Sequence, residues 1–166
     1  MAETAFRGNP VHTGGDLPAV GSTAPAFNLT GGDLSAVTSE GLAGGRVVLN
    51  IFPSIDTPVC AASVRAFNER AASLANTTVV CVSADLPFAA GRFCEAEGIA
   101  NVTTGSTFRS GDFLDDYGVG IAGGALSGLC ARAVVVIGAD GTVLHSELVP
   151  EITDEPDYDA AIASLG

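Results

Sequence analysis

Residues 46–60 read RVVLNIFPSIDTPVC and carry the pattern that decides the fold. The run from Arg46 to Phe52 is almost continuously apolar, which is typical of a strand buried in the centre of a sheet. Pro53 ends this run. Thr57, followed by a proline, opens a helix, because threonine is a favourable N-cap and proline is favoured at the first helical position. Cys60 then lies in the first turn of that helix.

The predicted helix packs on the sheet through the face that begins with Cys60. Apolar residues follow this cysteine at helical steps of four and three, namely Val64, Phe67, Ala71 and Leu74. The sulfur is therefore expected to point inward, towards the end of the strand. A helix start offers unpaired N–H groups and the positive end of the helix dipole, and both stabilise a thiolate.

The rest of the chain predicts further strands and helices in alternation. Up to about residue 39 it is rich in Gly, Pro and Thr, which predicts short strands and turns with an extended piece at 25–29. Later patterns predict strands at 78–83, 101–104, 133–137 and 142–148, and helices at about 85–98, 112–117 and 157–165. The last two strands form a hairpin across Asp140-Gly141. Glycines 118 to 128 belong to a structural loop.

This order of elements predicts an α/β, thioredoxin-like three-layer fold. Its central mixed sheet is flanked by helices and preceded by an N-terminal strand extension. We find no internal repeat and no shift in composition along the 166 residues, so we expect residues 1–166 to form a single domain.

Charge and composition exclude several functions. Nineteen Asp and Glu oppose seven basic residues, all arginine, and the net charge of -12 disfavours binding to nucleic acids or anionic membranes. The absence of lysine removes Schiff-base chemistry and the lysine of a phosphate-binding loop. The first twenty residues lack the pattern of a secretory signal, so we expect a cytoplasmic protein.

Thiol chemistry remains after these exclusions. The four cysteines, at positions 60, 81, 94 and 130, form no C-x2-C pair, and His12 and His145 are distant from them in sequence, so we expect no metal. No G-x-S-x-G elbow is present. We expect no cofactor, and in a chain of this kind free cysteines indicate redox catalysis before structural crosslinks.

The chain resembles the bacterial thiol peroxidases, which are atypical two-cysteine peroxiredoxins. Four stretches carry the resemblance: NIFPSIDTPVCAASVRAFNERA, SADLPFAAGRFC, ARAVVVI and VPEITDEPDYDAA. The pattern P-x3-T-x2-C is specific to peroxiredoxins, and a second cysteine on the next helix indicates this subfamily. The resemblance implies a thioredoxin-dependent enzyme, active as a homodimer, that reduces hydrogen peroxide and organic hydroperoxides.

The resemblance also implies a role for five residues. Cys60 is the peroxidatic cysteine, which attacks the hydroperoxide and becomes a sulfenic acid. Thr57 donates or relays a hydrogen bond to the thiolate and the peroxide, and its hydroxyl can also cap the helix. Pro53 packs over the sulfur and limits access of water. Arg132 supplies a permanent cation, and Cys94 is the resolving cysteine that forms an intrachain disulfide with Cys60.

Other interpretations stay open at this point. The chain could be a one-cysteine peroxidase that uses an external thiol, or a non-catalytic redox sensor that passes oxidation to a partner. Cys81 is interpreted as a core residue, and Cys130 as either inert or a source of a competing disulfide. Because Cys60 and Cys94 start on separate helices, we expect the helical turns that bear them to rearrange when a disulfide forms.

Overall fold

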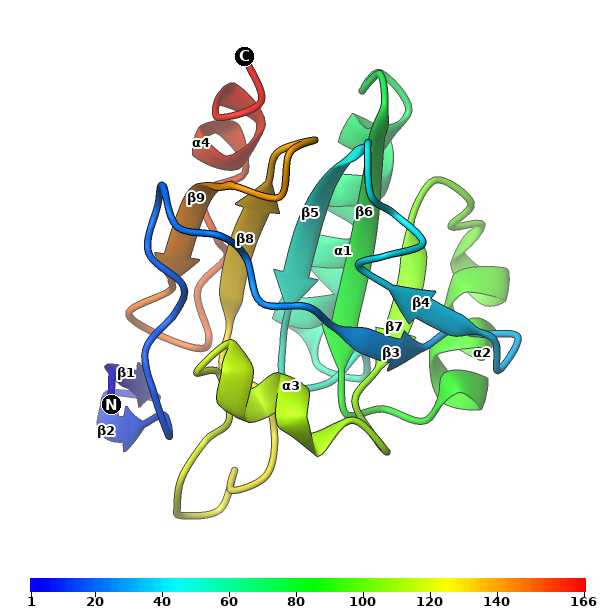
Figure 1. Ribbon diagram of the computed structural model, residues 1–166. Helices are drawn as coiled ribbons and strands as arrows, with labels where there is room; N and C mark the ends of the chain where they lie inside the picture. The colour runs from blue at the N-terminus through cyan, green and yellow to red at the C-terminus, as the bar shows by residue number, and fades with distance from the viewer.

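The computed structural model describes residues 1–166 and has a seven-stranded sheet at its centre (Figure 1). The strands are β3 (Asn28–Thr30), β4 (Ala36–Thr38), β5 (Arg46–Ile51), β6 (Thr77–Ser83), β7 (Thr103–Ser106), β8 (Ala133–Ile137) and β9 (Val143–Leu148). Their order across the sheet is β4-β3-β7-β6-β5-β8-β9. β5, β6 and β7 run parallel, whereas the outer pairings are antiparallel. The predicted mixed sheet is confirmed.

Helices cover both faces of this sheet, as the three-layer prediction requires. They are α1 (Pro58–Ala71), α2 (Pro87–Glu97), α3 (Gly111–Asp116) and α4 (Tyr158–Ala163). α1 and α4 contribute Phe67 and Ala161 to the core on one face, and Phe93 of α2 packs against the same core. α3 contributes Phe113 to the core on the other face (Figure 1).

The central strands form where the sequence is rich in β-branched residues. Leu49 of β5 pairs with Val80 of β6 on one side and with Val135 of β8 on the other. All three side chains are fully buried. Since both faces of these strands are covered, they need continuous apolar runs, which the sequence supplies.

Several element boundaries differ from those predicted. α1 ends at Ala71, so Leu74 lies beyond the helix. β7 starts at Thr103, because the N–H of Asn101 donates to the Asn68 side chain at the end of α1, 2.8 Å away, and is not paired in the sheet. β3 covers Asn28–Thr30, not 25–29, while the helix at 112–117 and the final helix are shifted or shortened by one or two residues.

An N-terminal hairpin stands apart from the main sheet. Its strands, β1 (Glu3–Phe6) and β2 (Asn9–His12), pair with each other in a separate two-stranded sheet. The hairpin is bonded to the segment after β9: the N–H of Ala5 donates to the Pro150 carbonyl at 2.9 Å, and the N–H of Ile152 donates to the Ala5 carbonyl at 2.8 Å. The predicted N-terminal extension therefore holds residues 149–152 in place.

The glycine-rich stretch is a structural loop that leads into β8. Gly118 has a φ of 66°, and a Cβ there would lie 2.2 Å from the carbonyl oxygen of Asp16, so only glycine fits. The N–H of Ala131 donates to the Val119 carbonyl at 2.8 Å, which ties the end of the loop to its beginning. None of the helices is long and apolar enough to cross a membrane.

Candidate active site

Cys60 lies in the first turn of α1 and is completely buried. The helix begins at Pro58, as predicted, and Cys60 is 0% exposed. It belongs to the same core cluster as Phe52, Val64 and Phe67. No acidic residue occupies the first turn, so the unpaired N–H groups of the helix start meet no competing negative charge there.

The guanidinium of Arg132 contacts this cysteine. Nη2 donates to Sγ of Cys60 at 3.1 Å, and Nε donates to the carbonyl oxygen of Ile152 at 2.7 Å, which fixes the plane of the group. Arg132 is only 2% exposed, and its Nη1 is buried without a hydrogen-bond partner. A buried donor without a partner is costly, so Nη1 is available to a bound molecule.

A cavity of about 360 Å³ lies beside the guanidinium and is lined by Pro53, Thr57 and Arg132. Apolar side chains complete much of its wall, among them Phe6, Val59, Leu126, Leu129 and Ile152. Arg132 both lines the cavity and contacts the buried sulfur, so it links the two. A cavity of this size with few polar groups is typical of a small-molecule site.

The expected capping bond of Thr57 is absent. Thr57 occupies the N-cap position with extended backbone angles, φ -98° and ψ 146°, yet its side chain caps no helix N–H. The hydroxyl instead donates to the carbonyl oxygen of Ser54 at 3.1 Å. The tight loop between Pro53 and the helix brings that carbonyl within reach, and a side chain turned towards it cannot face the helix N–H groups.

Asp85 is a residue of this site whose role the sequence did not reveal. It was expected only to open the second helix, but Leu86 is the N-cap of α2. Its carboxylate instead accepts hydrogen bonds from Ser54 Oγ at 2.8 Å, the Ile55 N–H at 2.7 Å and Ser83 Oγ at 2.7 Å. A signal was present, since Asp85 follows β6 and the carboxyl ends of adjacent parallel strands meet at one edge of the sheet.

Cys94 lies on α2 and is not bonded to Cys60. All four cysteines are free thiols in this structure. Cys94 is half-buried, and burial raises the pKa of its thiol. α2 lies next to α1, because Arg65 of α1 forms an ion pair with Glu97 at 2.6 Å and stacks on the ring of Phe93.

The other two cysteines are core residues. Burial raises the pKa of the Cys81 and Cys130 thiols to about 12, so both stay protonated at neutral pH and are poor nucleophiles. Cys130 belongs to the core on the sheet face opposite Cys60. No group of three His, Cys, Asp or Glu side chains gathers in a way that could hold a metal ion.

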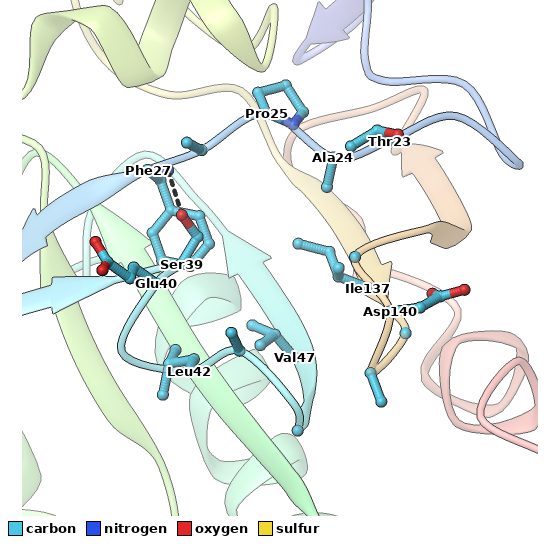
Figure 2. A pocket seen from close by; sticks show the side chains of 16 residues that line it. Thr23, Ala24, Pro25, Phe27, Ser39, Glu40, Leu42, Val47, Ile137 and Asp140 are labelled. Atoms are coloured by element: carbon cyan, nitrogen blue, oxygen red, sulfur yellow. Dashed lines mark hydrogen bonds between the residues drawn. The ribbon is translucent and has the colours of Figure 1, made fainter.

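A second cavity of about 360 Å³ opens around Phe27, Val47 and Ile137 (Figure 2). Val47 is near the start of β5, whereas the Cys60 loop follows the end of that strand. The only hydrogen bond drawn there joins the N–H of Phe27 to Ser39 Oγ at 3.1 Å. No cysteine lines this cavity, so it offers no thiol for redox chemistry.

Comparison with known proteins agrees with the geometry. The Redoxin family model matches residues 19–162. A thiol peroxidase of Mycobacterium tuberculosis is 61% identical over 166 residues, covering 100% of this chain and 99% of that protein. A thiol peroxidase of Corynebacterium glutamicum is 56% identical over 165 residues, covering 99% of each chain. The crystal structure of a peroxiredoxin-like protein from Aquifex aeolicus, 42% identical, superposes with a TM-score of 0.93 over 98% of this chain and 95% of that one.

Proposed function

Since this chain belongs to the redoxin family and is a thiol peroxidase, an enzyme that reduces peroxides, we propose that it works through a Cys60–Cys94 cycle driven by thioredoxin. The observation that carries the proposal is the 3.1 Å contact between Arg132 Nη2 and Cys60 Sγ beside a cavity. A fixed cation next to a buried sulfur stabilises the thiolate that this chemistry needs.

In the first step the Cys60 thiolate attacks one oxygen of the hydroperoxide. A sulfur–oxygen bond forms and the oxygen–oxygen bond breaks, leaving a sulfenic acid on Cys60 and releasing water or an alcohol. Arg132 Nη1, which has no partner in the resting protein, donates to the peroxide oxygens as charge develops on them. Thr57 lines the cavity, and its hydroxyl turns from Ser54 towards the peroxide. Pro53 shields the sulfur from water.

In the second step Cys94 resolves the sulfenic acid. Its thiol attacks the Cys60 sulfur, a disulfide forms within the chain, and the hydroxyl leaves as water. Burial raises the pKa of the Cys94 thiol in the resting protein, so exposure of α2 during a rearrangement makes this cysteine a better nucleophile. The dithiol of thioredoxin then reduces the disulfide by exchange.

The cavity wall supports a range of substrates. Leu126, Leu129 and Ile152 present apolar surface beside Arg132, so organic hydroperoxides fit there as well as hydrogen peroxide. We also propose that the enzyme consists of a single domain and acts in the cytoplasm. Its four cysteines are free, and the cytoplasm is a compartment that keeps thiols reduced.

We propose that two copies of the chain form a homodimer. Leu86 and Phe88, at the start of α2, are 53% and 69% exposed, and Phe108 is 44% exposed. Phe108 lies near the same point, because Ser106 Oγ bonds both the N–H of Phe108 and the carbonyl of Asp85. Exposed aromatic side chains close to one another favour a protein interface.

Mapping crosslinks after a single oxidation tests the mechanism. Reduced protein is mixed with one equivalent of hydrogen peroxide, and its disulfides are located by mass spectrometry. We expect an intrachain Cys60–Cys94 bond and a mass lower by two hydrogens. Another dominant disulfide would refute the mechanism.

Variants separate the remaining interpretations. Cys94→Ser should abolish turnover with thioredoxin, and survival of turnover would indicate a one-cysteine peroxidase. Cys130→Ala is the matched control and should leave turnover unchanged, because Cys130 lies on the opposite face of the sheet. Peroxide consumption by the wild type at the rate of a free thiol would instead indicate a sensor.

A further inference from the structure

Asp85 joins the two segments that carry the reacting cysteines. Ser54 and Ile55, which donate to its carboxylate, lie in the loop that leads to Cys60. The helix that carries Cys94 begins at Pro87, two residues after Asp85. The half-buried side chain of Asp85 therefore connects the loop before Cys60 to the N-terminal end of α2, the helix that carries Cys94. We call the carboxylate and its three donors, Ser54 Oγ, Ile55 N–H and Ser83 Oγ, the latch.

The latch also reaches the catalytic hydroxyl. Ser54 donates its side chain to Asp85, while its carbonyl accepts from the hydroxyl of Thr57 at 3.1 Å and from the Thr57 N–H at 3.2 Å. Ile55 is 3% exposed and belongs to the same core cluster as Cys60. The bonds to Asp85 therefore hold both the polar and the apolar parts of the loop in the arrangement found around the buried sulfur.

Disulfide formation requires this arrangement to change. Arg65 of α1 lies level with Phe93 and Glu97 of α2, since it contacts both. Cys60 precedes Arg65 by five residues, which is about 7.5 Å along a helix, whereas Cys94 directly follows Phe93. Cys60 therefore lies about a turn and a half before the point where α1 contacts α2 beside Cys94, and it is fully buried and not bonded to Cys94. A disulfide needs Cα atoms within about 7 Å and aligned Cβ atoms, so one or both segments must move.

We propose that Asp85 is a positioning residue that sets how the Cys60 sulfenic acid is partitioned between resolution and over-oxidation; the inference rests on the proposed function. With the latch closed, Cys60 stays buried against Arg132, beside the cavity. A second hydroperoxide can then oxidise the sulfenic acid to a sulfinic acid, being itself reduced to an alcohol or water. With the latch open, Cys94 attacks the sulfenic acid, the disulfide forms and water leaves.

Asp85→Asn weakens the latch without removing its volume. The amide has one acceptor oxygen where the carboxylate has two, so it cannot accept all three bonds. A hydrogen bond to a charged group favours the closed arrangement by about tenfold or more. We therefore expect the rate of disulfide formation from the sulfenic acid to rise about tenfold in Asp85→Asn, and the sulfinic fraction at high peroxide to fall correspondingly. In a Cys94→Ser background, Asp85→Asn should leave the first reaction with peroxide nearly unchanged, because a rise of about tenfold in a minor open state leaves the closed arrangement dominant.

Two controls separate a latch from a general loss of stability. Asp56→Asn removes the same charge from an exposed neighbour and should leave the partition unchanged. Val135→Ala destabilises the buried sheet on the face opposite Cys60 and should also leave the partition unchanged. Ser54→Ala, which removes one donor from the other end of the latch, should shift the partition in the same direction as Asp85→Asn.

The measurement is quenched-flow oxidation followed by mass spectrometry of the disulfide and the sulfinic acid. An unchanged partition in Asp85→Asn, or an equal shift in Val135→Ala, overturns the proposal. If the wild type forms no Cys60–Cys94 disulfide, the proposed function fails. If the wild type forms it and Asp85→Asn partitions like the wild type, only the latch fails.

Discussion

Arg132→Gln is the substitution with the largest expected effect on the chemistry. The guanidinium offers one donor to the sulfur, Nη2 at 3.1 Å from Cys60, and a second, Nη1, that is free. A hydrogen bond to a charged group contributes about 1.5–3 kcal/mol, so two contribute about 3–6 kcal/mol. At about 1.4 kcal/mol per tenfold change in rate, the reaction of Cys60 with hydrogen peroxide should slow by at least about 100-fold.

The assay isolates the first chemical step. Reduced protein is mixed with hydrogen peroxide, quenched with acid, alkylated, and analysed for remaining Cys60 thiol by mass spectrometry. Arg132→Lys keeps the charge but cannot bond Ile152 and Cys60 in the same planar geometry, so it should recover only part of the rate. Arg65→Gln, which alters a solvent-exposed ion pair, is the matched control and should react like the wild type.

One result would refute the role of Arg132 in the peroxide step. An Arg132→Gln protein that keeps the wild-type circular dichroism and reacts within about threefold of the wild-type rate would show that the guanidinium does not drive the reaction. A loss of rate that simply follows unfolding would be recognised from the thermal transition. Loss of the bond to the Ile152 carbonyl should destabilise the protein by about 1–3 kcal/mol, so the comparison is made well below the melting temperature.

Thr57, the two buried thiols and the exposed ring of Phe88 can each be tested separately. Thr57→Val should slow the peroxide step about tenfold or more. It should change the free energy of unfolding by less than about 1 kcal/mol, because the side chain makes no capping bond. Thr57→Ser should restore the rate, whereas full activity of Thr57→Val would exclude the hydroxyl from the chemistry. Stability in urea should fall as pH rises from about 9 towards 12, because burial raises the pKa of the Cys81 and Cys130 thiols from 9.0 to about 12 and the folded chain keeps protons that the unfolded chain releases. Each thiol should lower the free energy of unfolding by about 1.4 kcal/mol per pH unit in this range. Cys130→Ala should remove the contribution of one thiol, and an unaltered slope in that variant would contradict a raised pKa for Cys130. Phe88→Ser should weaken the homodimer in sedimentation experiments, whereas Val20→Ser, at another exposed apolar site, should not. If the two variants sediment alike, the interface does not include Phe88.

The core of the fold follows from local signals that agree with one another. In β5 and α1 the apolar run, the proline at the helix start and the apolar face after Cys60 all favour the same strand–loop–helix unit. The Asp140-Gly141 hairpin and the end of α2 close to residue 98, where Gly98 caps the helix, were predictable for the same reason. Each signal lies within a few residues of the structure that it specifies.

The details of the site depend on contacts between distant segments. Arg132 is oriented by the carbonyl of Ile152, a backbone atom that no side-chain pattern identifies. Thr57 occupies the expected position, but the loop geometry turns its hydroxyl towards Ser54. The role of Asp85 depends on β5 and β6 ending at the same edge of the sheet, which the sequence implies only once the strand order is known.

The N-terminal hairpin has a consequence for the integrity of the enzyme. Ala5 holds Ile152, Ile152 orients Arg132 and Arg132 contacts Cys60, so three contacts join the first residues of the chain to the reacting sulfur. Phe6 and Arg7 also form part of the cavity wall. Cleavage after residue 12 would remove both the bond from Ala5 to Ile152 and two residues of the cavity wall, although none of the removed residues belongs to the seven-stranded sheet. We therefore expect this truncation to lower the activity of the enzyme before it unfolds the sheet.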